Sequence, residues 1–336
     1  MRTARSARRA TSFRRARQRV SPQEGRRGDF VSEPVSPPLR AGIIALIGRA
    51  NVGKSSLLNA ILGEKVSIVS PIAQTTRNVV RGIHTEARGQ LVFHDTPGIH
   101  KAVGDLGRVM NRMARSAAVG ADVAMLVLDA SQPPREEDCG WMKRLHREAT
   151  PLVIAVNKMD VAGASAEPFR AAWEAERPAD AVERPAPIWC EVSAATGQGL
   201  EALTAILFEQ VPEGPLLFPD DILSDFPRKL AIADVIREKL FGVLREELPH
   251  AIAVWVEQLD EEADPWQVTA TIFVQKHSQK GIVIGEKGRL LRKVRREAEA
   301  ELATWFDKPI KVELWVKVEA KWDRNFWLLK KLGYTQ

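Results

Sequence analysis

Residues 48–55 constrain this chain more than any other segment does. They read Gly-Arg-Ala-Asn-Val-Gly-Lys-Ser and lie between an apolar run, residues 43–47, and a helix-prone stretch, residues 56–60. A buried strand, a turn of exposed backbone N–H groups and a helix N-terminus, whose dipole favours anions, together form a phosphate-binding loop. We therefore expect a strand–loop–helix unit of the kind found in α/β folds.

The lysine and serine that end this loop predict a nucleotide site. Lys54 is expected to contact the β- and γ-phosphates, and Ser55 to ligate Mg²⁺. The expected nucleotide contacts in the loop and the start of the helix are Gly48, Arg49, Asn51, Val52, Gly53, Lys54, Ser55 and Ser56.

A carboxylate follows the next apolar run. Residues 91–94 read Leu-Val-Phe-His and lead into Asp95-Thr96-Pro97-Gly98. If this run is a strand, Asp95 lies at its C-terminal edge beside Ser55, where it can hold Mg²⁺ directly or through water. The Gly98 N–H can approach the γ-phosphate. The two motifs together predict a site for a nucleoside triphosphate with Mg²⁺.

A third apolar run, residues 152–156, precedes Asn157-Lys158-Met159-Asp160. A carboxylate at Asp160 can accept two hydrogen bonds from guanine N1 and N2, whereas adenine offers no such pair of donors. Taken alone, an Asn-Lys-x-Asp string is as often a solvated turn. Its position after a strand, behind the two phosphate motifs, favours guanine as the base that Asn157, Lys158 and Asp160 bind.

Ser193 and Ala194 follow a fourth apolar run, residues 188–192. We expect them to complete the base pocket through their backbone. The order of these elements is that of a GTP-binding domain, with GTP or GDP as its ligand.

Short apolar strands alternate with helix-periodic stretches from residue 41 to residue 212. The expected helical stretches include residues 105–119, 136–148 and 200–210. Alternation of this kind implies crossover connections and a mainly parallel sheet with helices on both faces. We therefore expect an α/β P-loop GTPase domain, the G domain, at residues 41–212.

A second domain is expected beyond a linker at residues 213–227, which is marked by Pro212, Pro215, Pro219 and Pro227. In residues 228–336 the predicted helices and strands do not alternate regularly, and their order predicts an α+β domain. Its expected elements are a helix at 228–246, strands at 251–259 and 268–275, a basic helix at 289–304 and a strand at 311–318.

Gly285-Glu286-Lys287-Gly288 lies between two helical segments of this second domain. A Gly-x-x-Gly loop in that position is typical of a type II KH module, where small residues let an RNA backbone come close. Residues 276–300 carry eight Lys or Arg against three acidic residues, which favours RNA. The alternative, a helix N-terminal turn followed by a solvated charged face, stays open. The expected RNA contacts are Lys280, Gly285, Glu286, Lys287, Gly288, Arg289, Arg292 and Lys293.

Six of the nine tryptophans fall in the second domain. Base stacking would use them, but a small domain also needs bulky core residues, and we expect the core to hold Trp255 and Trp315, which lie on predicted strands. The two cysteines, Cys139 and Cys190, are too few and too scattered for a disulfide framework or a zinc site and favour a reducing compartment. No apolar run is long enough to span a membrane.

Basic charge is concentrated at the N-terminus. Residues 1–40 hold eleven Lys or Arg and three acidic residues, a net of +8, so the remainder carries about −2 of the total of +6. We expect this tail to be disordered. It is open whether the tail is an RNA-touching arm, a leader without a role or an organelle transit peptide; a cytoplasmic protein is the favoured interpretation.

From about residue 41 to residue 333 the chain resembles the Era family, GTPases with a C-terminal KH domain that act in small ribosomal subunit assembly. The resemblance is carried by the nucleotide motifs above and by blocks that are more specific to the family. These blocks are Gln74-Thr75-Thr76-Arg77, Glu313-Leu314-Trp315-Val316-Lys317-Val318 and Leu332-Gly333-Tyr334.

The resemblance implies that GTP favours a form whose KH domain binds the 3′ end of small-subunit ribosomal RNA, and that hydrolysis resets it. It implies the small ribosomal subunit as partner and, in some members, peripheral contact with the inner face of the cell membrane. We expect a monomer. Ala50 stands where Era proteins usually have proline, and we expect this change to be harmless.

The motifs also predict how GTP is hydrolysed. Ile99 occupies the position where Ras-like GTPases carry a water-orienting glutamine, so we expect slow intrinsic turnover and find no convincing general base. Asn51 resembles the asparagine that coordinates K⁺ in related GTPases, which predicts K⁺-stimulated hydrolysis. Thr76, or else Thr75, is expected to ligate Mg²⁺ from switch I, residues 67–81. Switch II is expected at residues 99–108.

Two alternatives remain at this point. One is a tRNA-modification or membrane-associated GTPase of the same superfamily, which would lack selectivity for the rRNA 3′ end. The other is an RNA-binding protein with a mainly regulatory nucleotide domain. The intact Lys54, Ser55, Asp95 and Asp160 argue against the second.

Overall fold

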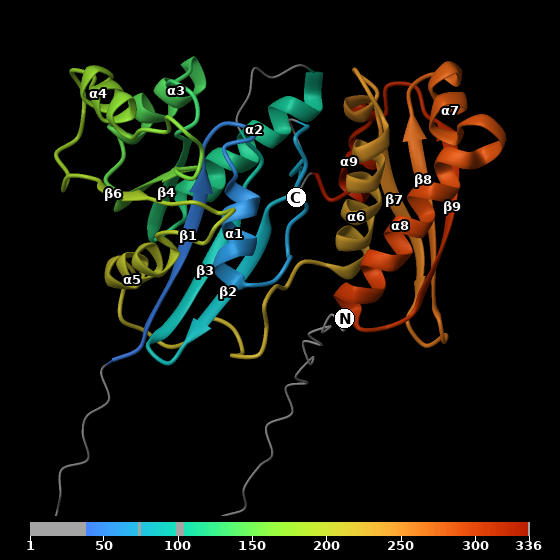
Figure 1. The fold of residues 1–336 in the computed structure, drawn as a ribbon, viewed down its shortest axis with the longest axis horizontal. Coiled ribbons are helices and arrows are strands. Elements are labelled where there is room, and N and C mark those ends of the chain that lie inside the picture. Colours follow the sequence, from blue (N-terminus) through green and yellow to red (C-terminus); the bar gives the residue numbers. More distant parts are fainter. Residues whose placement is uncertain (1–37, 73–74, 99–103, 335–336) are drawn as a thin grey trace, which may run out of the picture. The chain divides into compact units, whose positions relative to one another are not determined.

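The computed structural model of this chain describes residues 38–72, 75–98 and 104–334 (Figure 1). The predicted basic tail lies outside them except for its last residues. The first strand begins at Arg40, one residue before the predicted boundary of the G domain. Pro38–Gln336 form one compact unit, so the two predicted domains share contacts that are described below.

The G domain contains a six-stranded sheet whose strand order is β2-β3-β1-β4-β5-β6. Only β2 is antiparallel to its neighbour, β3, and the other pairs are parallel. The strands are β1 (Arg40–Ile47), β2 (Val80–Glu86), β3 (Gly89–Asp95), β4 (Val123–Asp129), β5 (Leu152–Asn157) and β6 (Ile188–Glu191).

Helices cover both faces of this sheet, as the sequence predicts. Alternate residues of β1 point to opposite sides: Ile44 and Leu46 pack with α1 and α5, whereas Ala45 and Ile47 pack with α3 and α4. The helices are α1 (Lys54–Leu62), α2 (Gly104–Val119), α3 (Glu136–Leu145), α4 (Glu167–Ala175) and α5 (Leu200–Gln210). The α/β prediction is confirmed; α3 ends three residues before the predicted end of its helical stretch.

The C-terminal elements form a second, three-stranded sheet in the order β7-β8-β9, with β7 antiparallel and β9 parallel to β8. The strands are β7 (Ala253–Asp260), β8 (Trp266–Val274) and β9 (Ile310–Val318). The helices are α6 (Arg228–Val243), α7 (His277–Ile284), α8 (Arg289–Phe306) and α9 (Phe326–Lys331), with short 3₁₀ turns η1 (Pro249–Ala251), η2 (Glu286–Gly288) and η3 (Trp322–Arg324). The order of helices and strands is that of the predicted α+β domain.

Two hydrophobic cores hold the C-terminal sheet. On one side α6 and α8 pack against it through residues such as Ile236 and Leu302. A separate cluster joins β7 and the C-terminal segment, including Trp322, to Leu106 and Met110 of α2. Because α2 belongs to the G domain, this second core lies between the two domains.

The prediction that Trp315 fills the core is wrong. Its side chain is 53% exposed, because Val312 and Val316 on the same strand face inward and neighbouring strand residues alternate. Trp322, which carried no assignment of its own, is fully buried instead.

The predicted linker at residues 213–227 contains no helix or long strand, but it is fastened to the sheet. Gln90 on β3 is fully buried, and its side-chain amide donates to the Phe218 carbonyl at 3.0 Å. The same amide oxygen accepts from the backbone N–H groups of Leu217 (2.9 Å) and Phe218 (2.8 Å). Further along, the Ile83 N–H on β2 donates to the Leu223 carbonyl at 2.8 Å.

We predict that Gln90→Ala destabilises the protein by about 2 kcal/mol, because it leaves partly buried backbone groups of the linker without their side-chain partner. Gln267→Ala is the matched control, since that exposed amide also bonds one carbonyl, that of Pro265. Denaturant titration of both variants measures the difference. Equal unfolding midpoints for the two variants would show that the linker is not held by Gln90.

Candidate functional site

The predicted motif residues meet at the C-terminal edge of the G-domain sheet. Asp95 ends β3, Asn157 ends β5, and the phosphate-binding loop follows β1 directly. The strand register aligns Leu46 with Asp95, and Asp129 with Asn157. Parallel pairing therefore brings residues that are far apart in the sequence to one edge.

The phosphate-binding loop closes around the Lys54 side chain. The Lys54 ammonium donates to the Gly48 carbonyl at 3.2 Å and to the Arg49 carbonyl at 2.9 Å. Gly53 has a φ of 96°, and a Cβ there would lie 2.4 Å from the Asn157 amide nitrogen. Only glycine fits this turn, so the loop geometry accounts for the residue type at this position.

Burial lowers the pKa of Lys54 to about 8, despite the opposing effect of the Asp95 carboxylate. The ammonium therefore lacks enough negative charge around it. Phosphate oxygens beside the loop would supply that charge.

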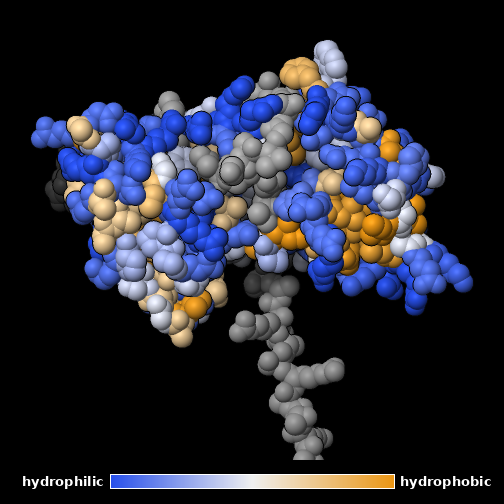
Figure 2. All heavy atoms as spheres, turned by 90° about the horizontal axis from the view of Figure 1, so that it is seen from above, coloured by the Kyte–Doolittle hydropathy of each residue, from blue (hydrophilic) through white to orange (hydrophobic). Residues whose placement is uncertain are grey.

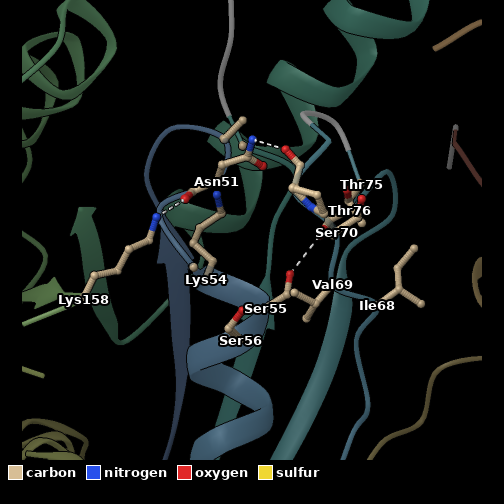
Figure 3. Close-up of a pocket in the computed structure, with 14 residues that line it drawn as sticks. Asn51, Lys54, Ser55, Ser56, Ile68, Val69, Ser70, Thr75, Thr76 and Lys158 are labelled. Carbon is tan, nitrogen blue, oxygen red and sulfur yellow. Dashed lines mark hydrogen bonds between the residues drawn. The ribbon is translucent and has the colours of Figure 1, made fainter. Parts of the chain in front are cut away.

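Four oxygen-bearing side chains gather beside Lys54. The Ser55 hydroxyl donates to the Asp95 carboxylate at 2.5 Å and lies 2.9 Å from the Thr76 hydroxyl, as Figure 3 shows for the second pair. Ser67 also donates to Asp95, at 2.8 Å. The other Asp95 oxygen is buried without a hydrogen-bond partner, and burial raises the pKa of this carboxyl group. Hard oxygen donors with an unsatisfied carboxylate oxygen fit Mg²⁺.

Of the two candidate threonines of switch I, Thr76 lies beside this cluster. The Thr75 hydroxyl instead donates to the Ile72 carbonyl at 2.6 Å. Val80 and Arg81, which we placed in switch I, belong to β2. Residues 73–74 of switch I and 99–103 of switch II lie outside the described residues, so the prediction for Ile99 does too.

Asn157 joins three of the predicted motifs. Its amide nitrogen donates to the Val52 carbonyl at 2.9 Å, and its amide oxygen accepts from the Ala194 N–H at 3.0 Å. Ser193 donates to the Asp160 carboxylate at 2.6 Å, and Asp160 itself is exposed. The side chain of Asn157 thus holds the loops together, while Asp160 lies at the surface, where it can meet a base.

The Arg49 side chain does not line the cavity at the phosphate-binding loop but bonds the Ala50 carbonyl and two aspartates. Its guanidinium is buried and contacts Asp138 at 3.1 Å and Asp129 at 3.5 Å. The predicted nucleotide contact of Arg49 is thus limited to its backbone. Asp129 also pairs with Lys158 at 2.7 Å, and the sequence analysis missed it. The signal was available, because Asp129 ends an apolar run as Asp95 does.

Asn51 and Gly98 lie where the loop meets the switches. The Asn51 amide nitrogen donates to the Pro71 carbonyl of switch I at 2.9 Å. A Cβ on Gly98 would lie 2.6 Å from the Ala50 backbone, so Gly98 is in close contact with the loop. The Asn51 backbone carbonyl accepts a hydrogen bond from the Lys158 ammonium at 3.0 Å (Figure 3). Val52 is buried. Ser56 lines a cavity of about 410 Å³, and Asn51 and Gly98 line the same cavity.

The Gly-x-x-Gly loop of the C-terminal domain connects α7 to α8. Gly285 and Gly288 have φ values of 73° and 74°, and Lys287 has a φ of 49°. A Cβ on Gly285 would lie 2.7 Å from the Leu290 side chain. The loop therefore needs glycine for its own shape, and it presents Glu286 and Lys287 to solvent.

The basic residues predicted for RNA lie within this loop and on the helices α7 and α8 on either side of it. Lys287, Arg289, Arg292 and Lys293 are exposed and Lys280 is half-buried. Within the described residues, only Lys293 of these five has an ion-pair partner, Glu297 at 3.8 Å. The cations are thus available to phosphates.

Two large hydrophobic side chains of the C-terminal domain are exposed. Ile282, on α7, is 56% exposed, and Trp315 on β9 is 53% exposed. Figure 2 shows hydrophobic residues gathered on the part of the molecule that holds the C-terminal elements. An exposed tryptophan is available for base stacking, the use of these residues that the sequence left open.

Comparisons with known proteins identify the family of each domain. Residues 43–158 match the family described as 50S ribosome-binding GTPase, and residues 247–323 match the KH domain family. GTPase Era of Geobacter metallireducens is 40% identical over 301 residues, which cover 89% of this chain and 99% of that protein. The chain belongs to the Era family of GTPases. GTPase Era of Geotalea uraniireducens is 39% identical and covers 88% of this chain and 98% of its own length.

Two solved Era structures have the same fold. Era in complex with MgGDPNP and nucleotides 1506–1542 of 16S ribosomal RNA is 33% identical with a TM-score of 0.80, and a single-residue variant of Aquifex aeolicus Era bound to GDP·AlF₄⁻ is 33% identical with a TM-score of 0.81. Each covers 89% of this chain and 100% of its own. A match to Era over both domains disfavours the alternative of a tRNA-modification GTPase.

No helix among the described residues of this Era chain is long and apolar enough to cross a membrane. The same residues contain no cluster of three or more His, Cys, Asp or Glu side chains that could hold a metal ion.

Lys54 predicts proton uptake when the nucleotide binds. At pH 8 about half of the Lys54 amines are neutral in the free protein, and phosphate charge raises their pKa, so GDP saturated with Mg²⁺ should bind with uptake of about half a proton. Titration calorimetry in buffers of different ionisation enthalpy measures it. The uptake declines towards pH 7, where Lys54 is already charged; binding heats that are independent of buffer at pH 8 would contradict the prediction.

Proposed function

We propose that this protein is a GTP-binding and GTP-hydrolysing switch that binds the 3′ end of small-subunit ribosomal RNA and assists assembly of the small ribosomal subunit. The main support is the presence, in one compact unit, of a phosphate-binding loop, oxygen donors that fit Mg²⁺ and a KH domain with exposed cations around its Gly-x-x-Gly loop. The Era structure with MgGDPNP and 16S rRNA nucleotides supports the same combination.

Hydrolysis would depend on positioning and charge. Lys54 lies where it can neutralise the β- and γ-phosphates, and Ser55 and Thr76 would hold Mg²⁺, with Asp95 binding it directly or through Ser55 and water. Mg²⁺ supplies positive charge to the phosphate oxygens when bound. The Gly98 N–H, next to the loop, would face the γ-phosphate. None of the described side chains in this cluster is a base that could activate water, which favours slow turnover.

Guanine would be read at the other end of the site. Asp160 is exposed and is oriented by Ser193, so one carboxylate oxygen is fixed while the group faces solvent. Ala194 and Lys158 surround this position. An RNA client of this kind is consistent with a cytoplasmic protein, and we propose that location.

We propose a K⁺ ion at Asn51. The Asn51 residue has a φ of 64° and its side chain spans from the loop to switch I through Pro71. A cation bound there by the amide oxygen would add fixed positive charge over the phosphates, in the role of an arginine finger.

The K⁺ proposal predicts a rate several-fold higher in KCl than in NaCl at equal ionic strength. Asn51→Ala should lower the KCl rate to the NaCl rate and leave the NaCl rate nearly unchanged. Steady-state phosphate release measures both. Identical rates of the unmodified protein in the two salts would rule the ion out.

For RNA, we predict tighter binding in the GTP-like state. Fluorescence anisotropy at fixed salt would compare an oligonucleotide matching the rRNA 3′ end with a scrambled one, in the presence of GDP or a nonhydrolysable GTP analogue. Lys287→Gln should weaken binding several-fold, because it removes a phosphate partner beside the loop. Lys308→Gln is the matched control, since Lys308 is exposed and follows the far end of α8.

Equal affinity for the matching and scrambled oligonucleotides would contradict the rRNA assignment. Sequence-selective binding with the same affinity in the GDP and GTP-analogue states would support the RNA site but contradict the proposal that the nucleotide controls it.

A further inference from the structure

Thr76 is held in place from both sides by the C-terminal domain. It lies in a segment of switch I without helix or strand, yet its hydroxyl lies 2.9 Å from Ser55. Its two neighbours in the chain, Thr75 and Arg77, both bond to the KH domain. The position of this hydroxyl therefore depends on contacts outside the nucleotide site.

Arg77 inserts its whole side chain into the KH domain. It is fully buried, and its guanidinium donates to the Ile252 carbonyl at 2.8 Å and to the Pro249 carbonyl at 3.3 Å. The guanidinium carbon lies 5.8 Å from the ring centre of Trp322 and 6.0 Å from that of Phe241. These residues define the Arg77 seat.

Arg237 on α6 bonds Thr75, the residue that precedes Thr76. Its guanidinium donates to the Thr75 carbonyl at 2.7 Å. The same group is oriented by Asp234 at 2.9 Å and by the Tyr334 hydroxyl at 3.0 Å. Arg237 and Tyr334 are both buried. The terminal Leu-Gly-Tyr block is therefore part of the support of switch I.

The Arg77 seat favours a fully inserted Arg77 side chain over partly withdrawn positions of this part of switch I. Within the described residues no carboxylate lies within ion-pair distance of Arg77, so its buried charge is balanced at short range by carbonyl dipoles, aromatic rings and the Tyr334 hydroxyl, with Asp234 farther away. A buried guanidinium that loses such partners is strongly disfavoured. A partly withdrawn Arg77 is thus unfavourable, and the segment is either seated or released.

Helix α6 also holds the start of switch I. Glu238, next to Arg237, accepts from the Val69 N–H at 2.8 Å and from Lys65 at 2.7 Å. Lys65 bonds Glu301 of α8 as well, at 2.6 Å. Two consecutive residues of one helix therefore hold switch I at Val69 and at Thr75.

We propose that Arg77 and Arg237 are positioning residues for GTP hydrolysis, through which the KH domain places the Thr76 hydroxyl at the Mg²⁺ site. The proposal builds on the function proposed above. In GTPases, switch I contacts Mg²⁺ when the γ-phosphate is present, so a seat that holds Thr76 beside Ser55 would favour GTP over GDP. Because coupling between two binding sites is reciprocal, the same contacts make RNA affinity depend on the nucleotide.

The test compares three full-length variants. Arg237→Gln removes the bond to the Thr75 carbonyl, and Tyr334→Phe removes one hydroxyl, which orients Arg237 and also interacts with Arg77. Arg228→Gln is the control, because Arg228 lies on the same helix but is exposed and paired with Glu261. For each, kcat, KM, and the affinities for GDP and for a nonhydrolysable GTP analogue are measured with Mg²⁺ present, together with the melting temperature.

We expect Arg237→Gln to lower kcat at least ten-fold and to weaken the GTP analogue several-fold more than GDP. Tyr334→Phe should give a smaller change in the same direction, and Arg228→Gln none. In the anisotropy assay, Arg237→Gln should bring the RNA affinities of the two nucleotide states together. If Arg237→Gln does not fold, Tyr334→Phe, which loses a single oxygen, decides the question by the same ratios.

A purely structural role predicts a different result: a lower melting temperature with GDP and GTP-analogue affinities reduced by the same factor. That result, or an unchanged kcat in a folded Arg237→Gln variant, would overturn the proposal. Absence of GTP hydrolysis in the unmodified protein would instead reject the proposed function, and this inference with it.

Discussion

The parallel pairing of β1 with β3 is the constraint on which the nucleotide site depends. It places the end of one strand, where the loop around Lys54 begins, level with Asp95 at the end of the other. Both charged groups are buried there at a cost in solvation, and neither is neutralised by the side chains around it. The unliganded edge is therefore electrostatically incomplete, and a metal-bound polyphosphate has the charge pattern that completes it.

The sequence predicted this edge well because each motif is local. A glycine turn, a serine and a carboxylate after an apolar run report their roles without knowledge of distant residues. Contacts formed by tertiary packing could not be predicted from local sequence. Nothing near Arg49 in the sequence indicates that its side chain bonds Asp138. Nothing near Gln90 indicates that its side chain bonds the linker. The Trp315 error was different, since the alternation of β9 already placed that side chain outward.

The two domains share hydrophobic clusters and are not independent modules joined only by a linker. Switch I contributes Ile68 to the core of the KH domain, and α2 contributes Leu106 and Met110 to the cluster around Trp322. Apolar contacts of this kind resist separation, because any opening exposes surface to water. The family's nucleotide motifs and its C-terminal block are thus parts of one packed structure, which explains why a family signature extends to the end of the chain.

The linker has a further consequence for how far the KH domain can travel. β2 is the edge strand of the G-domain sheet, and the linker runs against it: Ile83 bonds Leu223, the Ser224 hydroxyl bonds the Arg81 carbonyl at 2.5 Å, and Arg81 pairs with Asp225 at 2.7 Å. This cover shields a strand edge that would otherwise invite pairing with another chain. It also leaves only residues 226–227 between these bonds and α6, so the linker holds too little free chain to let the KH domain move far from the G-domain sheet.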